Sequence, residues 1–123
     1  MNQIILIFLG GGLGSLVRYY LSQQFSNSNF QNLPIATLLA NIMASFILGI
    51  FIGYEMSHKI SSNYRLLLAV GFCGGFSTFS TFSADSLQLL QTNRIFEAFL
   101  NVALNVLLCI LATFVGLYLT KYI

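Results

Sequence analysis

The residues of this chain that could bind a ligand gather in one stretch, Gly71 to Ser83, which reads GFCGGFSTFSTFS. It combines glycines and a cysteine with a repeated Phe-Ser-Thr triplet. Residues three apart are neighbours on a helix, so phenyl rings line up on one side and hydroxyl groups on the others. Neutral hydroxyl donors and the partly positive edges of phenyl rings suit a small anion. The stretch therefore predicts an anion path that needs no fixed positive charge.

Further polar side chains lie inside apolar segments on both sides of this stretch. Asn41 has Thr37 one turn before it and Ser45 one turn after it. A second polar line recurs every four residues near the C-terminus, at Asn101, Asn105, Cys109 and Thr113. Polar groups at such depths usually face away from lipid, where they either hydrogen-bond neighbouring helices or line an ion pathway. Three polar lines on three segments favour a pathway.

The composition is that of a membrane protein. The chain has 123 residues, of which 57% are hydrophobic and 7% charged, against about 25% charged in a typical soluble domain. Its length predicts one domain, residues 1–123. The net charge of +2 is too small to suggest nucleic acid as a partner. We expect an all-α protein embedded in lipid.

Four apolar segments are each long enough for the roughly 20 residues that a transmembrane helix needs. They run from about Ile4 to Leu21, Ile35 to Tyr54, Leu66 to Leu90 and Ile95 to Leu119. The third is expected to break at Gly74-Gly75, because glycine costs about 1 kcal/mol in a helix relative to alanine. Helices broken at mid-membrane commonly bind ions. Small residues spaced by four, such as Gly10 and Gly14, or Ser45, Gly49 and Gly53, predict close helix packing.

The basic residues give a weak orientation signal. Four spans place both termini and the second connection on one side, which holds Lys59, Arg65 and Lys121 against Arg18 and Arg94 on the other. Orientation depends on a clear excess of Lys and Arg on the cytoplasmic side. Either the count is simply noisy, or the chain inserts both ways and pairs as an antiparallel dimer.

Neither a metal site nor an enzyme is indicated. Cys73 and Cys109 match no metal or redox spacing, and His58 stands alone in a predicted loop. No Ser/His/Asp or Cys/His constellation can be assembled around a single histidine. Arg18 is the only basic residue expected to lie partly within the membrane; it either snorkels to the headgroups or attracts an anion at a pore mouth.

The sequence motifs are specific enough to name a family. GFCGGFSTFSTFS in the third span, GGLGSLVRY at the end of the first and Asn41 in the second together resemble the Fluc (CrcB) family of bacterial fluoride channels. The resemblance covers the whole chain. It implies a multi-pass protein of the cell membrane that exports fluoride passively and so lowers cytoplasmic fluoride. It also implies an antiparallel, dual-topology homodimer with two pores.

The resemblance assigns roles to particular residues. Phe79 and Phe82 are similar to the paired pore phenylalanines, and Asn41 to the pore asparagine, with Ser80 and Thr81 beside it in the motif. Arg18 matches the arginine of the wide vestibule. The polar track of the fourth helix falls on Asn101, Asn105 and Cys109.

The resemblance also implies a bound Na⁺ at the dimer centre, held by the backbone carbonyls of Gly74 and Ser77 from both copies. Two positions are left without a role. Cys109 stands where a hydroxyl is expected, and Asp85 where an acidic residue is common.

Two other classes fit four short spans. A small dual-topology multidrug exporter needs a membrane-embedded carboxylate in the first span, and this chain has none there. A non-transporting assembly protein would use the polar lines only to pack helices. Fluoride flux through the purified protein separates all three.

Overall fold

The computed structural model describes residues 2–25, 33–58 and 60–122. Within these ranges it has four helical segments long and apolar enough to cross a membrane. These are α1, α2, a composite third span, and α6 followed by a short 3₁₀ turn, η2. Their bounds are α1 Gln3–Phe25, α2 Ile35–Ser57, α6 Ile95–Leu119 and η2 Thr120–Tyr122. The predicted all-α architecture with four spans is confirmed.

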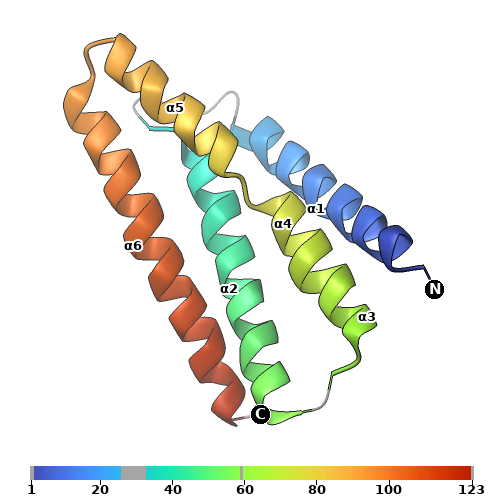
Figure 1. Ribbon diagram of the computed structural model, residues 1–123. Helices are drawn as coiled ribbons and strands as arrows, with labels where there is room; N and C mark the ends of the chain where they lie inside the picture. The colour runs from blue at the N-terminus through green and yellow to red at the C-terminus, as the bar shows by residue number, and fades with distance from the viewer. Residues whose placement is uncertain (1, 26–32, 59, 123) are drawn as a thin grey trace.

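The third span is built from four pieces rather than one helix. It begins with α3 (Ser62–Tyr64), continues as a π-helix, η1 (Arg65–Cys73), and reaches α4 (Gly74–Phe76) before the chain changes direction into α5 (Phe79–Gln91). In Figure 1 the turn between the yellow-green α4 and the yellow beginning of α5 is plain, and the spans alternate in direction. In that view the lower ends of α2 and α6 lie side by side, and α1 begins at the right, beyond α3 and α4.

The helices pair through glycines that permit close backbone contact. A Cβ at Gly75 in α4 would collide with the Gly11 carbonyl of α1, and one at Gly10 would collide with the Leu67 carbonyl. On the other side of the molecule, where α2 lies along α6 (Figure 1), a Cβ at Gly49 would collide with the Thr113 carbonyl. The small-residue lines therefore mark packing faces, as the sequence predicts.

The third span is broken as expected, but the predicted position of the break is wrong. Cys73 and Gly74 keep right-handed helical angles, and α4 continues through Gly75 to Phe76. The extended residues are Ser77, with ψ 157°, and Thr78, with φ −152° and ψ 115°. Gly75 stays helical because α1 packs against it, which offsets the low helix propensity of glycine.

Candidate functional site

A groove opens where the third span breaks, between α2, α5 and α6. Its volume is about 250 Å³. Most of its lining side chains are polar or aromatic: Asn41, Ser45, Ser77, Thr78, Phe79, Phe82, Asn105, Val106 and Cys109. Extended backbone within a membrane needs partners for its amide groups, so it is tolerated where it is buried in protein or lines a polar cavity. The groove therefore lies where extended backbone interrupts the helices of the fold.

Asn41 supplies the partners for the extended backbone. The Thr78 N–H donates to Asn41 Oδ1 at 2.8 Å, and Asn41 Nδ2 donates to the Thr78 carbonyl at 3.4 Å. One carboxamide thus satisfies both backbone groups of the residue at the break. Without it, a donor and an acceptor would be buried unpaired, at a cost of about 1–3 kcal/mol each.

Thr78 also starts the next helix. Its Oγ1 accepts the Thr81 N–H at 3.1 Å, which makes Thr78 the N-cap of α5. The same hydroxyl donates to Thr81 Oγ1 at 3.1 Å and lies 3.2 Å from Ser80 Oγ. Ser80 and Thr81, both predicted pore residues, therefore cluster around Thr78 beside the groove, although neither is among the residues that line it.

An amide chain connects the break to α6. Asn41 Nδ2 donates to Asn105 Oδ1 at 2.9 Å, and Asn105 Nδ2 donates to the Oδ1 and the backbone carbonyl of Asn101 at 3.1 and 3.0 Å. Asn101 Nδ2 donates to Ser86 Oγ at 3.0 Å, and Ser86 donates to the Phe82 carbonyl at 2.8 Å. This series of hydrogen bonds therefore ends on α5 and links α6 to the first two turns of that helix.

The two asparagines of α6 differ in position. Asn105 lines the groove, with 5% of its surface exposed. Asn101 is 1% exposed and lies behind Asn105, away from the groove lining. The structure thus brings Asn105 to the groove with Asn41, while Asn101 supports that pair from the interior.

The two phenylalanines predicted for the pore are adjacent. The ring centroids of Phe79 and Phe82 lie 5.5 Å apart, with the ring planes inclined by 51°. This is the tilted arrangement in which a ring edge approaches a neighbouring face. Phe79 is 79% exposed and Phe82 partly buried, so one side of the pair is uncovered in a single chain.

The carbonyls near the break fit the predicted cation ligands. In a continuous helix the Thr78 N–H would donate to the Gly74 carbonyl, but here it donates to Asn41. The space beside Gly74 is open, since a Cβ there would meet no atom within 4 Å. The Ser77 side chain donates to the Cys73 carbonyl at 2.8 Å, and the Ser77 backbone is extended. Two backbone oxygens with this freedom are hard ligands of the kind Na⁺ prefers.

Arg18 and Asp85 lie outside the groove lining. Arg18 is partly buried on α1, and its Nε has no hydrogen-bond partner within the described part of the chain. Asp85 Oδ2 accepts a hydrogen bond from Thr37 Oγ1 at 2.8 Å, which joins α5 to the start of α2. The sequence alone gives Asp85 no role, whereas in the structure its carboxylate links α5 to α2.

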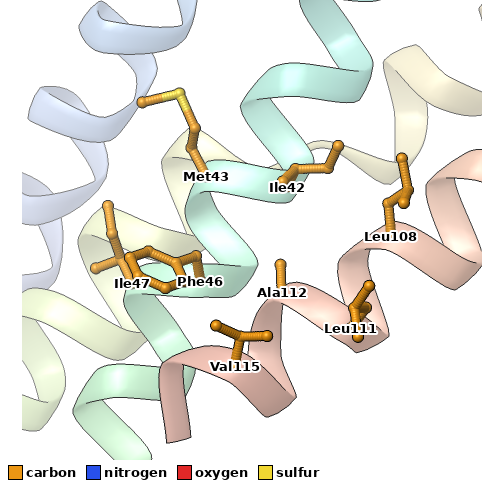
Figure 2. A pocket seen from close by; sticks show the side chains of 8 residues that line it. All are labelled: Ile42, Met43, Phe46, Ile47, Leu108, Leu111, Ala112 and Val115. Atoms are coloured by element: carbon orange, nitrogen blue, oxygen red, sulfur yellow. The ribbon is translucent and has the colours of Figure 1, made fainter. Parts of the chain in front are cut away.

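A second hollow, of about 460 Å³, lies between α2 and α6. Figure 2 shows that its lining side chains carry only carbon and the sulfur of Met43. It offers no donor to an anion and no oxygen to a cation. The polar groove is therefore the candidate site, although it is the smaller of the two.

The fold and the groove define a small multi-pass membrane protein with a polar, aromatic-lined groove at a broken helix. Residues 5–117 match the family model described as CrcB-like protein, Camphor Resistance (CrcB). The chain is 44% identical to the fluoride-specific ion channel FluC of Pyrococcus abyssi, over 98% of each chain. It is 41% identical to that of Flavobacterium psychrophilum over 98% of each, and 46% identical to that of an Enterobacter species over 87% of this chain and 85% of the relative. The chain belongs to the CrcB-like family.

Proposed function

We propose that this protein is a fluoride-specific channel of the cell membrane. The observation that carries the proposal is near full-length similarity to fluoride channels, and the groove joins neutral donors to a pair of phenyl rings. Fluoride is small and strongly hydrated, so a path must replace its water with close donors. The protein is a passive channel and not an enzyme. Fluoride leaves down its gradient, which lowers the cytoplasmic concentration.

Four of the residues assigned to the path line the groove, and the others lie outside its lining. Asn41 and Asn105 present carboxamides, and Phe79 and Phe82 present ring edges. Ser80 and Thr81 stand at the first turn of α5, and Arg18, in the second half of α1, serves the vestibule. Chloride is larger and is rejected by the width of the path and the spacing of donors rather than by charge.

The working unit is an antiparallel homodimer of dual topology. Phe79 and Gly74 are both exposed in the single chain, so the face around the break is available to a second copy. The weak bias of basic residues allows insertion in both orientations. An antiparallel pair buries the same face of each copy about a two-fold axis in the membrane plane.

A structural Na⁺ is held at the centre of that dimer by the Gly74 and Ser77 carbonyls. Because the ligands are backbone atoms, Ser77→Ala should retain the sodium dependence of assembly. Replacement of Na⁺ by a large organic cation should reduce the dimer fraction of both proteins equally. A loss of sodium dependence in Ser77→Ala alone would assign the ligand to the side chain instead.

Fluoride efflux from liposomes tests the function directly. Purified protein in fluoride-loaded liposomes should release fluoride to an external electrode without a proton gradient. A multidrug exporter would release none and would instead require a proton gradient to move cationic drugs. The absence of any acidic residue from α1 among the described residues already speaks against that class.

A further inference from the structure

The groove offers fewer free donors than its polar lining suggests. A carboxamide has two N–H groups. Those of Asn41 are directed at Asn105 Oδ1, at 2.9 Å, and at the Thr78 carbonyl, at 3.4 Å. Those of Asn105 are directed at the side-chain and backbone oxygens of Asn101. Both asparagines of the groove therefore have their donors occupied by protein acceptors.

Two of the three hydroxyls that line the groove are also occupied. Ser77 donates to the Cys73 carbonyl at 2.8 Å, and Thr78 donates to Thr81 Oγ1 at 3.1 Å. The third is Ser45, on α2 one turn beyond Asn41. Across the residues that the structure describes, no protein group accepts the Ser45 hydroxyl.

Ser45 differs in this respect from other helical serines of the chain. Three of these donate to the carbonyl four residues earlier: Ser57 to Gly53, Ser83 to Phe79 and Ser86 to Phe82, at 3.3, 2.9 and 2.8 Å. Two serines of α1 donate to other backbone carbonyls, Ser15 to Gly75 at 3.5 Å and Ser22 to Tyr19 at 2.7 Å. Such back-bonding is the usual way for a hydroxyl to be satisfied inside a membrane helix. Ser45 is half-buried in a groove, where an unpaired hydroxyl is costly unless a ligand or water accepts from it.

We infer that Ser45 is a binding residue for the permeating anion, with its hydroxyl donating to fluoride in the groove. The inference rests on the proposed function. A contact at Ser45 requires no protein hydrogen bond to open, whereas a contact at Asn41 must displace Thr78 or Asn105. Ser45 is therefore a donor that an ion in the groove can use without breaking a hydrogen bond within the protein. The Cys109 thiol lines the same groove but is only a weak donor.

The experiment compares single substitutions in fluoride-loaded liposomes at equal protein content. Ser45→Ala should lower the fluoride efflux rate by about tenfold, as expected for the loss of one hydrogen bond to an ion. Ser57→Ala is the matched control, because it makes the same change on the same helix outside the groove, and its efflux should equal that of the unchanged protein. Ser45→Thr keeps the hydroxyl and should conduct fluoride. Ser45→Val has the shape of the threonine variant without its hydroxyl and should not conduct.

The outcomes separate the inference from the proposed function. If the unchanged protein releases no fluoride, the proposed function fails. If it conducts and Ser45→Ala conducts equally well, the function stands and the inference is overturned. Gel filtration and thermal unfolding check each variant. Should Ser45→Ala not fold, the comparison of Ser45→Thr with Ser45→Val decides, because equal rates in that pair overturn a role for the hydroxyl.

Discussion

The side chain of Asn41 on α2 hydrogen-bonds both backbone groups of Thr78: it accepts from the Thr78 N–H at 2.8 Å and donates to the Thr78 carbonyl at 3.4 Å. The side chain thus replaces two partners that a continuous helix would have supplied. It also fixes where α5 begins, because Thr78 caps that helix. The direction of α5, and with it the position of Phe79 and Phe82, depends on this contact between α2 and the break.

Replacing Asn41 should therefore affect folding as well as flux. Asn41→Ala removes the acceptor of the Thr78 N–H and the donor to Asn105 Oδ1, at about 1–3 kcal/mol for each buried group left unpaired. We expect a lower thermal unfolding temperature and little fluoride efflux. Asn63→Ala, an exposed asparagine of α3, is the matched control and should change neither. An Asn41→Ala protein as stable as the unchanged one would show that the break is held by other contacts.

The adjacent glycines of α4 should respond differently to the same substitution. A Cβ at Gly75 collides with the Gly11 carbonyl, whereas a Cβ at Gly74 meets nothing in the chain. Gly75→Ala must push α1 away from α4 and should destabilise the fold by about 1–3 kcal/mol. Gly74→Ala should leave the fold of one chain intact and weaken only dimer assembly. Thermal unfolding at dilutions that separate the copies distinguishes these effects; equal destabilisation would contradict the assigned packing.

The position of the break shows where sequence reasoning reaches its limit. Helix propensity points to Gly74-Gly75, yet these residues are helical and the extended residues are Ser77 and Thr78. Helix propensity is a weak local preference. It is outweighed here by the packing of α1 on Gly75 and by the two hydrogen bonds between Asn41 and the Thr78 backbone. A local signal did exist, because a threonine that precedes a helical segment is a common N-cap.

The spans themselves were predictable because lipid dictates their length and polarity. The α6 bounds, Ile95–Leu119, agree with the apolar segment, while α1 extends to Phe25, beyond the predicted end at Leu21. The π-helix η1 was not predicted, since its sequence is as apolar as that of an α-helix.

The sequence does not show which polar donors are already hydrogen-bonded within the protein. Asn101, Asn105 and Ser45 all read as polar residues on membrane helices. Only the packed structure shows that Asn101 lies behind the groove, that Asn105 is fully engaged, and that the Ser45 hydroxyl is free within the described ranges.

The membrane topology of the chain can be tested by adding basic residues on one side of the membrane. The second connection carries His58 and Lys59, and four spans place it on the same side of the membrane as both termini. A reporter fused after Ile123 should be active on both sides of the membrane. Adding two lysines to the connection should impose one orientation, with that connection in the cytoplasm, and should abolish fluoride efflux because antiparallel pairs can no longer form. A single orientation of the unchanged chain would rule out dual topology.

The aromatic pair gives the most direct test of how the ion is stabilised. The rings of Phe79 and Phe82 lie 5.5 Å apart at 51°, on the wall of the groove. A ring edge carries partial positive charge that can stabilise fluoride between donor sites, where no hydrogen bond reaches it.

Phe82→Ile keeps much of the side-chain bulk and removes that edge, so fluoride efflux should fall strongly while the dimer stays folded. Phe99→Ile on α6, where the ring is 73% exposed away from the groove, is the matched control and should conduct normally. Fluoride and chloride electrodes outside loaded liposomes measure both rates, and gel filtration confirms the dimer. Chloride efflux should be small in every protein. Undiminished fluoride efflux through a folded Phe82→Ile dimer would remove the ring edge from the mechanism, and equal fluoride and chloride rates in the unchanged protein would contradict selection by donor spacing.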